Sequence, residues 1–147
     1  MSNLAVIQSG LEGDLIAAGV ESVLPESVKM STFIRCAAVA IASGKDLGKA
    51  DKDSMIMALT QCAKDGLVPD SKEAAIVTFN TNVAGKGQPK QWMTKAQYLP
   101  MIDGVMKRAR QSGQIAVLSS KAVFNQDEFD YWMDENGEHI NYEPTYQ

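Results

Sequence analysis

Histidine and cysteine are scarce in this sequence of 147 residues, which has one histidine and two cysteines. A single imidazole supports neither a multi-histidine metal site nor an obvious catalytic triad, and His139 is explained more simply as a hairpin residue. Cys36 and Cys62 both fall in helix-like runs, so we expect reduced thiols, with Cys62 buried and inert. The scarce residues therefore favour a non-enzymatic protein that holds no metal.

Long apolar runs and nucleotide-binding motifs are also missing. No apolar run approaches the roughly 18 residues that a membrane span requires, and no basic region precedes an apolar core at the N-terminus. Gly44-Lys45 and Gly85-Lys86 lack the frame of a phosphate-binding loop. We therefore expect a cytoplasmic protein that uses neither ATP nor any other cofactor.

The composition is that of an ordinary globular chain, with 45% hydrophobic and 22% charged residues. Three glycines, Gly10, Gly13 and Gly19, interrupt any helix near the start, so residues 1–24 are predicted to be a flexible or partner-dependent arm. The remainder, residues 25–147, is long enough for a single domain.

The hydrophobic period changes along the chain, and it predicts an α+β fold. The order is N-terminal helices, a β-hairpin, a basic helix and an antiparallel β-meander. The expected helices cover 26–43, a segment from Asp51 to Gly66, and 98–112. Asp51 is expected to cap the second of these helices, and Gly66 is expected to end it in a left-handed conformation. The expected strands cover 74–79, 90–94, 115–124, 129–133 and 139–142.

Two of these helices carry apolar residues whose direction matters for function. On the 98–112 helix, one stripe is expected to face the core, formed by Ile102, Val105, Met106 and Ala109. The 26–43 helix is apolar over more than one face, at Met30, Phe33, Ile34 and Val39. We therefore expect this helix and the preceding arm to contribute to an interface between subunits.

Charge is unevenly distributed, although the formal net charge is only −4. Residues 71–121 carry eight basic and two acidic side chains, whereas residues 122–147 carry seven acidic and no basic ones. Phosphate binding depends on the local field rather than on the sum over the chain. The basic segment is thus a candidate nucleic-acid interface, although a solvated helix and hairpin would explain the same lysines.

Within the basic segment, Lys90 and Trp92 are two residues apart and should share a face of a strand, with Lys86 on the neighbouring loop. A cation beside an exposed aromatic ring can hold a phosphate and stack a base. The alternative is that Trp92 points into the core. On the following helix, Lys107 and Arg110 should share a face. The candidate DNA-binding residues are Lys72, Lys86, Lys90, Trp92, Lys95, Lys107, Arg108, Arg110 and Lys121.

The acidic end offers a different hypothesis, a metal-dependent nuclease. Its carboxylates are dense enough for a divalent ion. They flank predicted turns, however, such as Asn136-Gly137, and a solvated rim explains them more simply. We therefore predict no metal site, and the nuclease remains the weaker alternative.

Two ordered motifs resemble one known family. Residues 61–74 read Q-C-A-K-D-G-L-V-P-D-S-K-E-A, which is similar to the pattern Q-x-A-x-x-G-L-x-P-D-x-x-E-A of the RecT family of phage-encoded single-strand annealing proteins. A second block, from Gly104 to Phe129, resembles G-x-x-x-x-x-R-x-S-G-x-I followed by V-x-x-x-D-x-F. The resemblance covers about residues 25–144, most of the chain.

The resemblance implies ATP-independent binding of single-stranded DNA and annealing of complementary strands in homologous recombination. Its implied partners are single-stranded DNA, the annealed duplex and further copies of the chain in a ring or filament. Family members are usually longer, so we expect a C-terminally truncated, N-terminal portion of such a protein. A truncated structural or interaction protein without independent DNA binding is the other hypothesis.

Overall fold

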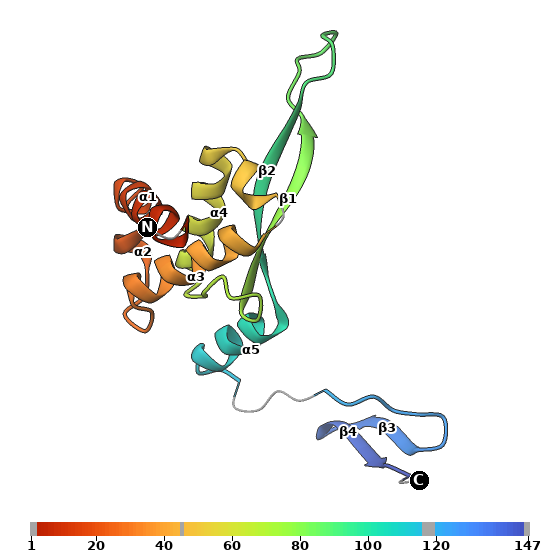
Figure 1. Ribbon diagram of the computed structural model, residues 1–147. Helices are drawn as coiled ribbons and strands as arrows, with labels where there is room; N and C mark the ends of the chain where they lie inside the picture. The colour runs from red at the N-terminus through yellow and green to blue at the C-terminus, as the bar shows by residue number, and fades with distance from the viewer. Residues whose placement is uncertain (1–2, 45, 116–119, 146–147) are drawn as a thin grey trace. The chain divides into compact units, whose positions relative to one another are not determined.

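The computed structural model describes residues 3–44, 46–115 and 120–145. It divides into two compact units, Met1–Ala116 and Val117–Gln147 (Figure 1). The sequence pattern predicted one domain over residues 25–147, and the structure differs at both ends. The first unit includes the N-terminal segment, and the last 31 residues form a unit of their own.

The N-terminal segment, for which the glycines predicted a flexible or partner-dependent arm, is helical in the structure. Helix α1 covers Asn3–Ala17 and α2 covers Val20–Val23. Leu11, Leu15 and Val20 are buried in the core of the first unit. Gly10 and Gly13 lie inside α1, where each costs about 1 kcal/mol relative to alanine. Burial of the leucines offsets that cost, which the glycine spacing alone does not reveal.

Helix α3 covers Met30–Ser43, beginning four residues later than predicted. Phe33 and Ile34 are buried in the core, where α1 packs against α3. These two side chains are therefore unavailable to a neighbouring subunit, contrary to the expectation for this helix. Val39 remains exposed. A short 3₁₀ helix, η1 (Leu47–Lys49), follows.

Helix α4 (Lys52–Lys64) begins and ends as its sequence predicts. The Asp51 carboxylate accepts a hydrogen bond from Ser54 N at 2.9 Å and caps the helix. Gly66 follows the helix with φ of 67°, the left-handed conformation expected there. A Cβ at Gly66 would also lie 2.9 Å from Pro25 Cγ. Leu67 then turns back into the core, where it is fully buried.

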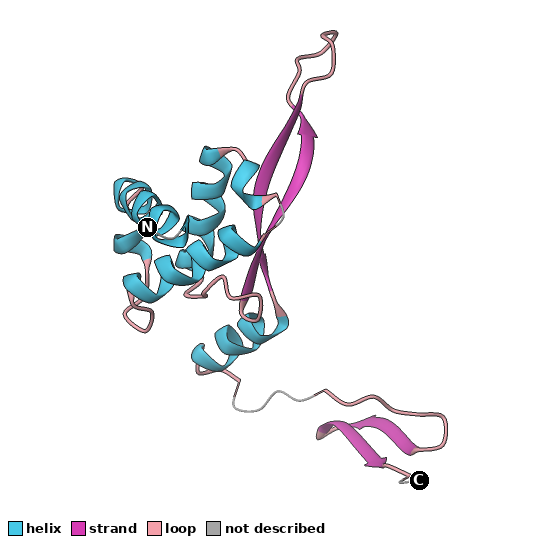
Figure 2. Ribbon diagram, in the orientation of Figure 1, coloured by secondary structure: helices cyan, strands magenta, loops and turns pink. Residues whose placement is uncertain are grey.

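Strands β1 (Ala74–Asn82) and β2 (Trp92–Pro100) form an antiparallel hairpin in which Thr78 lies opposite Ala96. Both strands are longer than predicted. Ile76 and Ala96 are buried on the face toward the helices. The distal part of the hairpin and its loop extend beyond the helices (Figure 2). The hairpin is therefore buried at its base and exposed at its tip.

Helix α5 (Ile102–Gln111) turns Ile102 and Val105 outward, which contradicts the prediction, whereas Met106 and Ala109 of the same stripe are half-buried. Ile102 is 72% exposed and Val105 is 47% exposed. The buried contact is made by Gly104, where a methyl group would overlap the carbonyl oxygen of Glu73. The close approach that glycine permits, together with polar contacts described below, decides which face of α5 packs.

The second unit is a hairpin of β3 (Glu128–Asp134) and β4 (Gly137–Glu143), as predicted for these strands. The expected meander is not complete in the structure. Ile115 and residues 120–124 lie outside regular structure, and residues 116–119 of the predicted strand lie outside the described residues. The α+β class is confirmed. Within the described residues, every helix is too short or too polar to cross a membrane.

Candidate nucleic-acid interface

Trp92 stands at the distal end of the β1–β2 hairpin. It is the first residue of β2, pairs with Asn82 and is 63% exposed. The alternative in which its ring enters the core is therefore wrong. Alternation along β2 places Trp92 on the same face as Ala96, but Ala96 lies where α4 covers the sheet and Trp92 lies at the strand end.

A set of hydrogen bonds holds the hairpin together at and beyond its last ladder pair. Asn82 Oδ1 accepts from Gln91 N at 2.9 Å and from Ala84 N at 3.1 Å. Val83 N donates to the Gln91 carbonyl at 2.8 Å. These bonds restrain the backbone on both sides of the loop and so position Trp92 next to it.

Two lysines of the tip, Lys86 and Lys90, are exposed on the loop that joins the strands. Neither ammonium makes an ion pair or hydrogen bond with any described residue. We predicted that Lys90 shares a strand face with Trp92. Lys90 precedes β2, however, so strand alternation does not apply to it, and the shared face stays a prediction. Lys95 is half-buried opposite Phe79 and, three residues from Trp92, lies on the other face of the hairpin.

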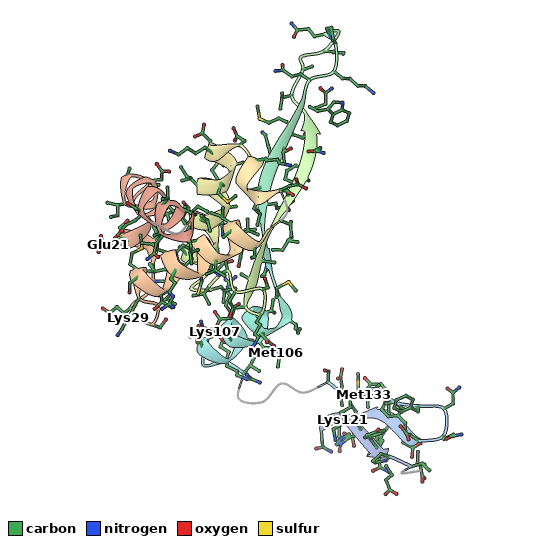
Figure 3. The ribbon with its side chains drawn as sticks, in the orientation of Figure 1. Glu21, Lys29, Met106, Lys107, Lys121 and Met133 are labelled. Carbon is green, nitrogen blue, oxygen red and sulfur yellow. The ribbon has the colours of Figure 1, made fainter. Side chains whose placement is uncertain are left out.

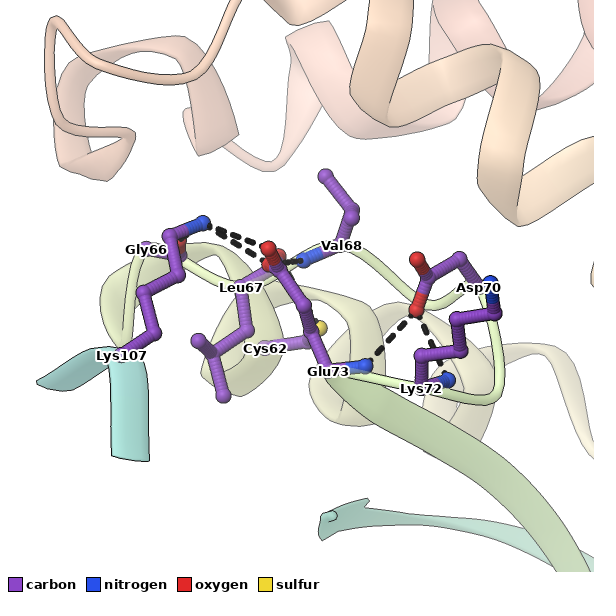
Figure 4. A network of polar contacts seen from close by, with 8 residues as sticks. All are labelled: Cys62, Gly66, Leu67, Val68, Asp70, Lys72, Glu73 and Lys107. Carbon is purple, nitrogen blue, oxygen red and sulfur yellow. Dashed lines mark hydrogen bonds and ion pairs between the residues drawn. The ribbon is translucent and has the colours of Figure 1, made fainter. Parts of the chain in front are cut away.

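Lys107 belongs to a different environment, on the side of α5 that faces the segment between α4 and β1 (Figures 3 and 4). Its Nζ atom lies 2.8 Å and 3.0 Å from the two carboxylate oxygens of Glu73 and donates to the Gly66 carbonyl at 3.2 Å. The two side chains of the ion pair are 28% and 24% exposed. Lys107 therefore serves the attachment of α5 in the structure.

Arg108 is paired in a similar way. Its guanidinium lies 3.0 Å from Asp65 Oδ2, which also accepts a 2.8 Å hydrogen bond from Tyr98 OH. Burial, followed by this hydrogen bond and the charge of Asp65, raises the pKa of Tyr98 above its ordinary value. Arg110, at the end of α5, is exposed and makes no ion pair within the described part of the chain.

The segment before β1 organises these contacts (Figure 4). The Asp70 carboxylate accepts hydrogen bonds from Lys72 N at 2.9 Å and Glu73 N at 2.8 Å, and Glu73 also accepts from Val68 N at 3.2 Å. The side chain of Lys72 is exposed. Sequence reasoning identified the cations but missed Glu73 and Asp65 as their partners. Both carboxylates lie within residues 61–74, the first motif of the family resemblance. That motif was the sequence signal from which these partners could have been found.

The Cys62 thiol lies beneath this segment and is buried, as predicted. Its Sγ atom donates to the Leu67 carbonyl at 3.3 Å. Burial, followed by the negative charge of Asp65, raises the pKa of this thiol to about 12. A thiol that stays protonated is a poor nucleophile, so Cys62 acts as a core residue.

Lys121 belongs to the second unit (Figure 3), where its Nζ atom lies 5.9 Å from the centroid of the Tyr142 ring. Asp127 accepts from Phe124 N at 2.9 Å and Thr145 N at 3.0 Å, and these bonds lower the pKa of its carboxyl group. Eight of the nine predicted residues thus lie on the first unit. Of these, the structure gathers Lys86, Lys90 and Trp92 at the hairpin tip.

The carboxylates of the second unit are engaged in local turns. Asp134 accepts from Asn136 N at 2.7 Å and contacts His139 Nε2 at 3.0 Å, and the His139 contact is the main cause of its lowered pKa. His139 also stacks on Trp132, with ring centroids 5.2 Å apart. In the described ranges, no group of three or more His, Cys, Asp or Glu side chains is arranged to hold a metal ion.

Comparison with known proteins relates the chain to one family. Residues 31–147 match the model of the RecT family. The chain is also similar to Protein RecT of Escherichia coli (strain K12), with 33% identity over 110 residues. That alignment covers 74% of this chain and 39% of the relative. No solved structure matches the chain. On the family match and this relative, the chain belongs to the RecT family.

Proposed function

We propose that this chain binds single-stranded DNA through the hairpin tip and contributes to the annealing of complementary strands in recombination, without ATP. The observation that carries the proposal is the exposure of Trp92 beside two unpaired lysines, Lys86 and Lys90, at the end of a projecting hairpin. An indole ring exposed to this extent gains little from the fold, so its surface is available for a ligand.

Single-strand binding uses the two kinds of group that the tip provides. Every base has an aromatic face that can stack on an indole ring, and the phosphates are attracted to lysine ammonium groups. Neither interaction reads a base sequence, so binding is expected to be largely non-specific. Annealing makes and breaks no covalent bond, and it therefore requires a basic track rather than a catalytic centre.

The remaining predicted cations have separate parts in this proposal. Lys72, Lys95 and Arg110 would make further backbone contacts with a longer strand, and Lys121 would make a separate contact on the second unit, whereas Lys107 and Arg108 would keep their internal partners. Because a long strand presents many equivalent sites, neighbouring copies on one strand would gain from contact with each other. We therefore include a homo-oligomer, in a ring or filament, and the annealed duplex among the expected partners.

The test is oligonucleotide binding by the Trp92→Ala variant, measured by anisotropy of a labelled single strand. Loss of base stacking should weaken binding by roughly 5- to 150-fold, the equivalent of about 1–3 kcal/mol. Trp132→Ala is the matched control, because Trp132 is also exposed but lies in the second unit. Equal affinities of the Trp92→Ala variant and the wild type would refute the proposal and favour an interaction protein.

A second measurement addresses annealing itself. Two complementary labelled strands should pair faster with the chain than without it, in buffer that contains no nucleotide. Trp92→Ala should reduce this acceleration together with binding. Acceleration that survives the loss of binding would contradict a role for the tip.

A further inference from the structure

The face of the β1–β2 hairpin that carries Trp92 also carries two asparagines. In the antiparallel ladder the odd-numbered residues of β1 bond to β2, as the flanking bond from Val83 N to the Gln91 carbonyl shows. Asn82 and Trp92 therefore form a pair without ladder hydrogen bonds, the kind whose side chains lie closest, with Cα atoms about 4.5 Å apart. Asn80 lies on the same face, diagonal to Trp92 and within reach of a group stacked on its ring.

Both asparagines are held by their amide oxygens. Asn82 Oδ1 accepts from Ala84 N at 3.1 Å and from Gln91 N at 2.9 Å, and only an oxygen can accept these bonds. Asn80 Oδ1 accepts from Thr94 Oγ1 at 2.8 Å. Neither Nδ2 group has a hydrogen-bond partner among the described residues. The amide orientations are thus fixed, and only hydrogen-bond donors remain available beside the indole ring.

The charged groups near this face are paired with each other. Helix η1 packs against β1 here, and Asn80 borders an open polar pocket that also contains Asp46 and Lys49. Lys49 Nζ lies 3.1 Å from Asp46 Oδ1. The Asp46 carboxylate would repel a phosphate placed beside Asn80, whereas an uncharged base meets no such repulsion. The surroundings therefore favour a base over a phosphate as the acceptor for these amide groups.

We propose that Asn80 and Asn82 donate hydrogen bonds to the minor-groove edge of a base stacked on Trp92, at purine N3 or pyrimidine O2. This contact rests on the proposed function, because the base belongs to the strand bound at the hairpin tip. Every base has an acceptor at this position, so the donors can hold any base. The acceptors of the other edges either differ between bases or take part in pairing. A base held by its minor-groove edge keeps its pairing edge free for the complementary strand.

Dimethyl sulfate tests the contact on an unmodified strand of deoxyadenosine, because the reagent methylates single-stranded adenine at both N1 and N3. N1 lies on the pairing edge and N3 on the minor-groove edge, so each base carries its own control. In the complex with the wild type, methylation should slow at N3, while N1 keeps the reactivity of the free strand. Equal protection of N1 and N3, or no protection of N3, overturns the proposal.

Base analogues test the same contact through affinity. In 3-deazaadenine a C–H group replaces N3, which removes the acceptor and keeps the ring size. In 7-deazaadenine the replaced nitrogen lies on the major-groove edge, so this analogue is the matched control. Anisotropy should show binding weakened by roughly 2- to 12-fold for the 3-deaza strand, the loss of a hydrogen bond between neutral groups, and unchanged for the 7-deaza strand. Equal affinities for the two analogues overturn the proposal.

A double variant, Asn80→Ala with Asn82→Asp, assigns the contact to these side chains. The carboxylate introduced at position 82 keeps an oxygen for Ala84 N and Gln91 N, so the loop retains these hydrogen bonds while the amide donors are lost. The preference for the 7-deaza over the 3-deaza strand should then disappear. Thr81→Asp adds the same charge on the opposite face of the hairpin and should keep the preference.

The affinity ratio of the two analogues is compared within each variant, so a general effect of the added charge on phosphate binding cancels. A double variant that keeps the preference, or a Thr81→Asp variant that loses it, overturns the proposal. Trp92→Ala separates this proposal from the proposed function. Wild-type affinity of Trp92→Ala refutes DNA binding by the tip. Weak binding by Trp92→Ala, together with equal binding of both analogues by the wild type, refutes only the asparagine contact.

Discussion

Lys90 and Lys107 both belong to the basic segment, yet their ammonium groups meet different surroundings. Lys107 of α5 lies against Glu73 and the Gly66 carbonyl and is half-buried. Lys90 is exposed beside Trp92 at the hairpin tip and has no partner in the described part of the chain. The contrast teaches that a cluster of basic residues in sequence can divide into cations that hold the fold and cations that remain available to a ligand.

The largest expected loss of stability comes from Gly104→Ala, because this substitution displaces α5 and moves Lys107 away from its partners. The new methyl group would overlap the Glu73 carbonyl, so the helix must move and both ion pairs of its inner face weaken. We expect a loss of about 2 kcal/mol in the free energy of unfolding, measured in urea.

Gly10→Ala is the matched control for Gly104→Ala. A Cβ at Gly10 meets nothing within 4 Å in α1, so this variant should be neutral or more stable by up to about 1 kcal/mol. Unchanged stability of Gly104→Ala would show that α5 is not held closely against Glu73.

Alkaline pH should lower the free energy of unfolding through two groups of the first unit, the Cys62 thiol and the Tyr98 hydroxyl. The Cys62 pKa is raised from 9.0 to about 12, and that of Tyr98 is also raised. Both groups therefore favour folding in their protonated form. Their contribution is complete below pH 9 and is lost as the unfolded chain ionises above it. We expect unfolding free energy to fall by roughly 1 kcal/mol per pH unit from pH 9 to 11.

Cys62→Ala serves as the control for the pH effect, because the slope rather than the absolute stability is compared. Without the thiol, the fall in stability from pH 9 to 10 should become shallower. A variant that keeps the wild-type slope would show that Cys62 ionises freely in the folded chain.

Lys107→Met tests the paired lysine directly. Removing the ammonium leaves the half-buried Glu73 carboxylate without its cation, which should lower the free energy of unfolding by about 1–2 kcal/mol, between the values for surface and buried pairs. Lys90→Met makes the same chemical change at the tip and should leave urea unfolding unaltered. Equal effects of the two substitutions would remove the distinction between the two regions.

The smallest effect on stability is expected for the combined Lys86→Ala and Lys90→Ala variant, which should unfold as the wild type does. Its effect appears in DNA binding instead. Each lost phosphate contact should reduce the slope of log affinity against log salt by about 0.7 for a single strand. Lys107→Met should keep the wild-type slope, and the opposite result would place the DNA contacts on α5.

Local signals in the sequence were sufficient for several elements. Three features were predicted and are confirmed: the cap at Asp51, the left-handed Gly66, and the two strands on either side of the hairpin loop. The strands are longer than predicted. These features depend on backbone preferences and on neighbours a few residues away. The lysines and Trp92 of the tip were also identified from sequence, and their role in DNA binding stays a prediction.

The direction in which α5 packs was not accessible from its own residues. Its apolar stripe predicted burial of Ile102 and Val105, but the close approach at Gly104 and the carboxylates of Glu73 and Asp65 turn the opposite face inward. The glycine-containing N-terminal segment is helical for a related reason. Its helices are stabilised by burial against α3 and α4, which the local glycine spacing does not report.

The sequence by itself determined the α+β class, the cap and the end of α4, the family and the segment that carries the positive charge. Only the tertiary structure decided which cations find carboxylate partners and which stay in solvent, because partners such as Lys107 and Glu73 lie 34 residues apart in the chain. It also decided that Trp92 is exposed, since burial depends on how far the helices cover the hairpin rather than on the strand pattern.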